Sequence, residues 1–311
     1  MQSKTKLKVL ILISLFILGC QPAKHYDYSD PYVTTVRHLI VNGTEIDADI
    51  FPRTVALVAP EKTYIFCTGT IISNDLIMTA AHCVTGVQGK KFYIMYGCKQ
   101  LQGCNNLIGV QKLSIYPGYD KTKKHWNDIA ILLLDRQVPL DTNVHTLHPS
   151  QYSELLKRGT EVIIAGYGRS SDKGAYGILR AGVTVVTKQY RNEIVLGRHM
   201  PEQSNICFGD SGSSFYIFHE GMKYVTGVAS RLFTVSDEQM CSGGSVYTLD
   251  GRYNHWILDE YTNMLTDTLP ETNYLKVNYS CSISGPAYRN SFQLCYIMIF
   301  FALFIRKMFR G

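Results

Sequence analysis

Three short segments of the chain hold residue types that together can hydrolyse an amide bond. His82 follows the apolar run LIMTAA, Asp128 directly precedes the apolar run IAILLL, and Ser211 lies in CFGDSGS. A serine hydroxyl attacks a carbonyl only when a base removes its proton, and an imidazole can act as that base near neutral pH. A carboxylate beside the imidazole fixes its tautomer and stabilises the imidazolium. The sequence therefore predicts nucleophilic hydrolysis by Ser211, with His82 as base and Asp128 as its partner.

The turn before the serine predicts where the developing negative charge is stabilised. The backbone N–H groups of Gly209 and Ser211 can both point at the oxyanion that forms on the attacked carbonyl. A side chain at Gly209 would hinder this turn and crowd the substrate. We therefore expect the oxyanion hole at these two residues.

Each segment taken alone has an ordinary structural explanation. A lone histidine is most often structural, an aspartate before an apolar strand is usually a turn residue, and GDSG also occurs in ordinary loops. The order His, Asp, Ser, each in its own local context, is far more specific. Two alternatives stay open: a catalytically silent surface-binding protein of the same fold, and a membrane-anchored structural lipoprotein, which would leave the three segments without a cause.

The elements that must position these residues are predicted to be β-strands. Residues 40–265 contain many short β-branched or aromatic runs with turn residues between them, and several runs are almost wholly apolar. Only residues 252–265 place apolar side chains at helical spacing. The pattern predicts an all-β body with a C-terminal helix.

The three segments, together with IVNG at Ile40, resemble the chymotrypsin/trypsin family of serine peptidases. The resemblance covers about residues 40–265, which we take as the peptidase domain. It implies two six-stranded antiparallel β-barrels with the site in the crevice between them. The first barrel would supply His82 and Asp128, and the second Ser211. Polypeptides are the substrates that this family implies, and no cofactor is expected.

The cysteines favour an oxidising compartment. The chain has nine, and none of them forms a C-x-x-C pair or has zinc-site spacing with histidine. Three disulfides are expected, the first two from the resemblance and the third from closeness in sequence: Cys67 with Cys83, Cys207 with Cys241, and Cys98 with Cys104.

The resemblance also locates the substrate pocket. Its base would be Asn205, which carries no charge, so a strong preference for Arg or Lys is not expected. Ser230 would hydrogen-bond the triad aspartate and start the strand that pairs with substrate. Arg231-Leu232 replaces the usual Trp-Gly at the mouth, and Ser245 replaces a Gly of the pocket wall. These changes predict a small or medium apolar side chain at the cleavage position.

By the same resemblance, the enzyme is made as an inactive zymogen. Cleavage before Ile40 would free an amino group that pairs with Asp210, because a buried ammonium needs such a partner. The residue before the cut is Leu39, where the family usually has Arg or Lys. We therefore expect a chymotrypsin-like or foreign activating peptidase, or self-cleavage.

Both ends of the chain are predicted to be sorting segments. Residues 1–20 have the basic start and apolar run of a signal peptide. Its ILGC end resembles a bacterial lipobox with Cys20 as the lipidation candidate, and ordinary signal cleavage nearby is the alternative. Residues 291–311 resemble a bacterial sorting tail, with a plain short anchor as the alternative. Two linkers, the first a propeptide, would flank the body: 21–39 and 266–290.

These ends predict a secreted protein, or one anchored at a bacterial cell surface or outer membrane. The formal net charge of +6 does not favour nucleic acid as a partner, because residues 40–270 carry 21 Lys or Arg and 22 Asp or Glu. No metal site is expected, since the loop 97–106 lacks the Asp and Glu that would hold calcium.

Overall fold

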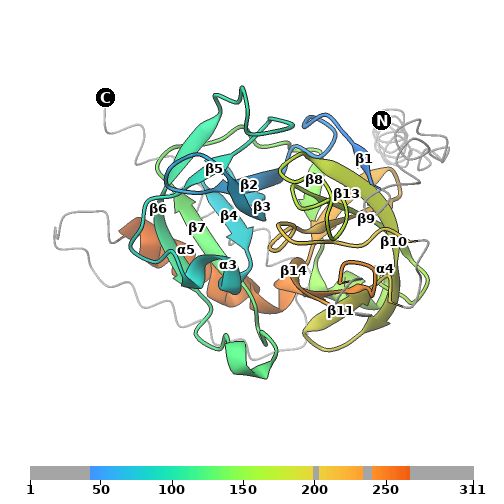
Figure 1. Ribbon diagram of the computed structural model, residues 1–311. Helices are drawn as coiled ribbons and strands as arrows, with labels where there is room; N and C mark the ends of the chain where they lie inside the picture. The colour runs from blue at the N-terminus through green and yellow to red at the C-terminus, as the bar shows by residue number, and fades with distance from the viewer. Residues whose placement is uncertain (1–42, 199–202, 234–239, 267–311) are drawn as a thin grey trace, which may run out of the picture. The chain divides into compact units, whose positions relative to one another are not determined.

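The computed structural model describes residues 43–198, 203–233 and 240–266 of the chain (Figure 1). Several predictions lie outside these residues: the signal peptide, lipidation at Cys20, the new N-terminus at Ile40 and the C-terminal tail. Within the part that is described, no helix has the length and apolar character needed to cross a membrane.

The first half of the body forms a closed six-stranded antiparallel barrel, as predicted. Its strands pair in the order β2-β3-β4-β7-β6-β5, and β5 returns to β2. All residues of β2, β4 and β7 are buried, which explains their unbroken apolar runs. The barrel strands are β2 (Thr54–Val58), β3 (Ile65–Ser73), β4 (Leu76–Thr79), β5 (Tyr93–Met95), β6 (Leu107–Ile115) and β7 (Ala130–Leu134).

The second half forms a nine-stranded sheet that does not close, so the predicted second six-stranded barrel is wrong in strand number and closure. The strands follow the order β14-β15-β11-β10-β9-β12-β13-β8, and β1 pairs with β10. They are β1 (Thr44–Glu45), β8 (Val144–Thr146), β9 (Glu161–Gly166), β10 (Arg180–Gln189), β11 (Glu193–Leu196), β12 (Phe215–His219), β13 (Met222–Thr226), β14 (Val228–Leu232) and β15 (Ser245–Thr248).

The reason for the open edge is the turn that carries the predicted nucleophile. The N–H of Gly212 donates to the Ala229 carbonyl over 2.8 Å, and the N–H of Ala229 donates to the Ser213 carbonyl over 2.8 Å. Gly212 has a positive φ of 86°, which a strand does not adopt. Two hydrogen bonds from a turn therefore take the place of a strand ladder beside β14.

Among the described residues, helices are few and short apart from the last one. The α-helices are α3 (Ala81–Thr85), α4 (Tyr152–Leu155) and α5 (Asn254–Thr266), and the 3-10 helices are η1 (Lys121–Lys123), η2 (Pro149–Gln151) and η3 (Asp250–Tyr253). The predicted C-terminal helix is confirmed as α5, whose first two predicted residues belong instead to η3. Met264 of α5 packs on Leu133 of β7, which covers this side of the barrel.

A row of buried hydroxyl groups joins the barrel to the second sheet. Unpaired polar groups are costly in a protein interior, so each hydroxyl of β2 and β3 in this row is matched by a partner from the second half. The three hydrogen bonds are each 2.8 Å long and join Thr54 to Tyr216, Thr70 to Ser214, and the Thr68 hydroxyl to the Gly209 carbonyl.

The structure contains the three disulfides expected from the sequence, at Cys67–Cys83, Cys98–Cys104 and Cys207–Cys241. The first ties β3 to the helix that carries His82. The third ties the Ser211 turn to the loop before β15. Each of these two bridges therefore braces a segment that contributes to the candidate site.

The closed barrel should respond strongly to loss of an apolar side chain from its interior. Leu132 of β7 is fully buried, so Leu132→Ala is expected to lower the free energy of unfolding by about 2–5 kcal/mol. Leu258→Ala is the matched control, because Leu258 of α5 is 46% exposed and its loss should change stability by under about 0.5 kcal/mol. Denaturant unfolding with disulfides intact measures both, and equal losses would contradict this view of the core.

Candidate active site

His82 and Asp128 lie together because β4 and β7 are antiparallel neighbours. Thr79, the last residue of β4, pairs with Ala130, the first residue of β7. His82 lies three residues after the end of β4, and Asp128 lies two residues before the start of β7. The two residues therefore meet at one edge of the barrel. His82 Nδ1 lies 2.7 Å from Asp128 Oδ2, and the His82 backbone N–H donates to Asp128 Oδ1 over 2.9 Å.

The loop before Asp128 is wound tightly and fixes the direction of this carboxylate. Asn127 has a positive φ of 55°, a conformation that asparagine tolerates better than most residues. Its side chain donates to the Gly118 carbonyl over 2.8 Å and accepts from the Tyr253 hydroxyl over 2.7 Å. The hydrogen bond from Tyr253, in the second half of the chain, thus helps to fix the loop that carries the buried Asp128.

Ser230 supplies a further hydrogen bond to the same carboxylate. Its hydroxyl donates to Asp128 Oδ2 over 2.6 Å, which is the contact that the family resemblance implies. The register between β14 and β15 shifts between Ala229 and Arg231, so Ser230 lies at a β-bulge. A bulge re-aims a side chain relative to a regular strand, and here it directs the hydroxyl across to the first barrel.

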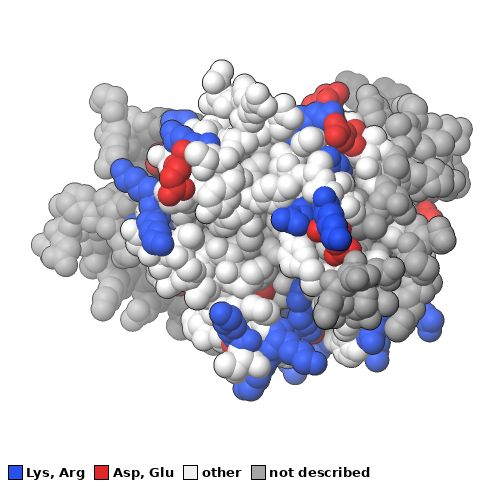
Figure 2. Space-filling view, in the orientation of Figure 1, with Lys and Arg blue, Asp and Glu red and all other residues white. Residues whose placement is uncertain are grey.

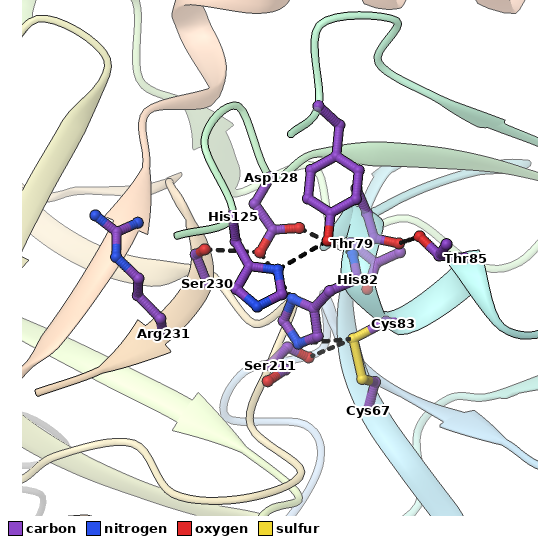
Figure 3. Close-up of polar contacts among 12 residues, drawn as sticks. Cys67, Thr79, His82, Cys83, Thr85, His125, Asp128, Ser211, Ser230 and Arg231 are labelled. Carbon is purple, nitrogen blue, oxygen red and sulfur yellow. Dashed lines mark hydrogen bonds and ion pairs between the residues drawn. A yellow bond between two sulfur atoms is a disulfide. The ribbon is translucent and has the colours of Figure 1, made fainter. Parts of the chain in front are cut away.

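The Ser211 turn is seated against the barrel close to His82 (Figure 3). The Thr68 N–H donates to the Ser211 carbonyl over 2.8 Å. The Cys83 Sγ atom lies 3.6 Å from that carbonyl oxygen and 3.9 Å from His82 Nε2. Ser211 and His82 therefore both contact the same sulfur atom. Among the described residues, the Ser211 hydroxyl makes no hydrogen bond to His82. Such contacts are often long before substrate binds.

Two glycines allow this turn to form. Gly209 has a φ of 100°, and a Cβ there would lie 2.6 Å from the Tyr176 ring and 3.0 Å from the Gly168 backbone. Gly212 has a φ of 86°, and a Cβ there would overlap the Thr68 carbonyl oxygen. Both positions therefore require glycine for conformation and for space.

Asp210 is buried beside Ser211 with backbone donors as its partners. Its carboxylate accepts from the Gly168 N–H over 2.7 Å and from the Cys207 N–H over 2.9 Å. Among the described residues no cation forms an ion pair with it. Burial raises the pKa of Asp210 to about 6, against its ordinary value of 3.8.

Ser230 and Ser245, of the predicted pocket residues, lie on the paired strands β14 and β15, and Asn205 lies in the segment between β11 and β12. Asn205 is buried, its amide donates to the Gln203 carbonyl over 3.2 Å, and its Oδ1 has no hydrogen-bond partner among the described residues. Ser245 is fully buried and pairs directly with Leu232 across β14 and β15. A leucine and a serine thus face each other where the family usually has glycines.

The positive charge beside the pocket is neutralised within the sheet. The Arg231 guanidinium makes two hydrogen bonds to the buried Glu193 carboxylate, at 2.7 and 2.9 Å. Figure 2 shows basic side chains gathered at the lower edge of this face, where η1 lies, while its middle is largely uncharged. Sequence reasoning missed the Glu193 pairing, which links residues 38 positions apart.

A second histidine beside His82 was also missed. The His125 ring centroid lies 5.1 Å from that of His82, and His125 Nδ1 is 2.8 Å from the Tyr119 hydroxyl. Burial lowers the pKa of His125 from its ordinary value. Its place three residues before Asp128 was the signal available in the sequence.

Comparisons with known proteins give the family. The trypsin family profile matches residues 40–257. The chain is 29% identical to mouse neutrophil elastase over 47% of its length and 57% of that protein. It is 26% identical to mouse vitamin K-dependent protein C, covering 70% of the chain and 51% of that protein, and 26% identical to macaque chymotrypsin-like elastase family member 1, covering 70% and 88%.

The chain thus spans little more than half the length of the first two relatives. All three are animal proteins, and they lend no support to the predicted bacterial origin or surface anchoring. The match over most of the body, together with the barrel and the paired histidine and aspartate, shows that this chain belongs to the trypsin family of chymotrypsin-like serine peptidases.

Proposed function

We propose that this chain is a serine endopeptidase that cleaves polypeptides through an acyl-enzyme intermediate. The observation that carries the proposal is the hydrogen bond of 2.7 Å between His82 Nδ1 and the fully buried Asp128, on the side of the ring away from Ser211. A carboxylate on Nδ1 leaves Nε2 as the nitrogen that can take a proton from the serine hydroxyl.

The proposed reaction begins when Ser211 Oγ attacks the peptide carbonyl and His82 Nε2 accepts the hydroxyl proton. The Asp128 carboxylate stabilises the imidazolium that results, and the N–H groups of Gly209 and Ser211 stabilise the oxyanion. The imidazolium then protonates the leaving amine, and the C–N bond breaks to give the acyl-enzyme. Water, deprotonated by His82, hydrolyses the ester and restores the serine.

We propose that the pocket binds a small or medium apolar side chain, that of the substrate residue at the bond that is cleaved. In this proposal the Leu232–Ser245 pair narrows the pocket, and Asn205, the described residue at its base, is neutral. A buried Arg or Lys side chain without a partner would be strongly disfavoured. The likeness to two proteins named as elastases is consistent with this preference.

We also propose that cleavage before Ile40, by an activating peptidase or by the enzyme itself, brings an ammonium group to Asp210. The buried carboxylate has only backbone N–H partners among the described residues, so a cation would remove most of its desolvation cost. The disulfides agree with the extracellular setting typical of such peptidases. Lipidation of Cys20 and a C-terminal anchor stay predictions from the sequence.

The central test is loss of activity without loss of structure. Ser211→Ala in the activated chain is expected to lower kcat/KM on peptide substrates by at least about 10⁴-fold, because the nucleophile is removed. Ser153→Ala, at an exposed serine of α4, should leave kcat/KM unchanged. A fluorophosphonate should label the parent chain and the Ser153 variant but not the Ser211 variant. An activated chain that neither cleaves nor labels would favour the silent binding protein instead.

The Asp210 carboxylate predicts how stability changes with pH in the uncleaved chain. Because its pKa is raised in the folded state, the folded form binds the proton more tightly than the unfolded form. The free energy of unfolding should therefore fall as pH rises from about 4 to about 6, by on the order of 2–3 kcal/mol from this group.

Asp210→Asn should remove this part of the pH dependence, and denaturant unfolding at a series of pH values measures it. Cleavage before Ile40 should also remove it, since the ammonium then stabilises the charged carboxylate. If the cleaved chain keeps the same dependence as the uncleaved one, the proposed pairing is wrong.

Substrate preference provides a further test. A set of peptides that differ only at the cleavage position should give kcat/KM at least about tenfold higher for Val or Leu than for Arg. Ser245→Gly enlarges the pocket and is expected to raise the relative rate on Phe. The highest kcat/KM for Arg or Lys in the parent chain would contradict the proposed pocket.

A further inference from the structure

Two imidazole rings lie against each other at the edge of the candidate active site. The His82 and His125 centroids are 5.1 Å apart, with an angle of 57° between the ring planes. One ligand atom from each of His82, His125 and Asp128 lies within 4.8 Å of the other two. Peptide hydrolysis as proposed uses only one of these two rings, so His125 is left without a role.

Both rings are held in the way that metal-binding histidines usually are. His82 Nδ1 is hydrogen-bonded to a carboxylate at 2.7 Å, and His125 Nδ1 is hydrogen-bonded to the Tyr119 hydroxyl at 2.8 Å. The carboxylate is an acceptor only, so it fixes the proton of His82 on Nδ1. When the Tyr119 hydroxyl accepts from His125 Nδ1–H, both rings present Nε2 to a metal. Among the described residues, neither Nε2 has an oxygen partner.

Asp128 lies on the Nδ1 side of His82 and already accepts three hydrogen bonds. It accepts from His82 Nδ1, from the His82 backbone and from the Ser230 hydroxyl. Its charge would still favour a cation on His82. Lys121 and Arg231 are the positively charged side chains that act on His125. The Arg231 guanidinium is matched by Glu193, and the exposed Lys121 ammonium is screened by solvent, so both oppose a cation only weakly.

We propose that the Nε2 atoms of His82 and His125 bind one divalent ion that favours nitrogen ligands, such as Zn²⁺, and that the bound ion silences the peptidase. Imidazole suits Zn²⁺, Cu²⁺ and Ni²⁺, whereas Ca²⁺ and Mg²⁺ prefer oxygen ligands. Two protein nitrogens leave the remaining coordination positions to water.

Inhibition follows from a competition for one lone pair. The metal would take the electron pair of His82 Nε2, which otherwise accepts the Ser211 proton, so the serine would stay unactivated. Each Nε2 donates its lone pair to the metal in a reversible coordinate bond, and no covalent bond of the protein changes, so a chelator should restore activity. This second half of the inference rests on the proposed function, whereas metal binding by the two rings does not.

The first experiment measures binding without using activity. Calorimetric titration of Zn²⁺ into the untagged full chain carrying Ser211→Ala should show a site that His125→Asn weakens by at least about tenfold. Asparagine is chosen because His125 has a φ of 57°, which asparagine also tolerates. His255→Asn, at an exposed histidine of α5, is the matched control and should leave the affinity unchanged.

A second variant keeps the test valid if His125→Asn disturbs the local fold. Tyr119→Phe keeps both rings and removes only the hydroxyl that orients His125, so it should weaken Zn²⁺ binding by a smaller factor. Equal Zn²⁺ affinity in the parent chain and in both the His125 and Tyr119 variants would overturn the proposal.

The second experiment measures inhibition of the activated chain. Zn²⁺ should inhibit peptide cleavage, chelation should reverse it, and Ca²⁺ or Mg²⁺ should have no such effect. His125→Asn should raise the inhibitory Zn²⁺ concentration at least about tenfold, each variant being compared with its own rate in chelator. The same Zn²⁺ sensitivity in His125→Asn and parent would overturn the inhibitory role. A chain with no peptidase activity would instead refute the proposed function, and calorimetry would still decide the metal site.

Discussion

The contact between β3 and the Ser211 turn is the constraint on which the candidate site depends. The Thr68 N–H donates to the Ser211 carbonyl, and the Thr68 hydroxyl donates to the Gly209 carbonyl, each over 2.8 Å. Backbone meets backbone here only because Gly212 has no side chain. Ser211 lies in a turn before β12 of the second sheet, and His82 lies in α3, which follows β4 of the barrel, so this seam sets the spacing between them.

The same seam provides partners for several of the polar side chains that lie in the interior. The hydroxyls of Thr54 and Thr70, like that of Thr68, have partners from the second half, and Asp128 receives three hydrogen bonds. A fully paired polar network costs little and gives a single geometry, whereas a partly paired one is costly. The positions of the candidate triad residues and the joining of the two halves thus depend on one network.

Asp210 differs from the rest of this network. It is buried with two backbone donors and a raised pKa, so the uncleaved chain carries a group whose charged form is poorly stabilised. His125 adds a second feature beyond the triad, because its ring lies against the proposed general base. If the two proposals hold, a cation at Asp210 and a metal ion at His125 each control activity from outside the candidate triad.

From its own residues the sequence determined the candidate triad and the C-terminal helix, because these depend on residue type, short motifs and the periodicity of apolar runs, which are local properties of the chain. The first barrel and the Cys67–Cys83 and Cys207–Cys241 pairs were implied by the resemblance to a known family, and the Cys98–Cys104 pair was inferred from closeness in sequence. The tertiary structure alone decided that the second sheet stays open, that Glu193 pairs with Arg231, and that His125 stacks beside His82. The physical reason is that each of these depends on how loops and turns from distant parts of the chain pack together. Neither periodicity nor motif spacing encodes that packing.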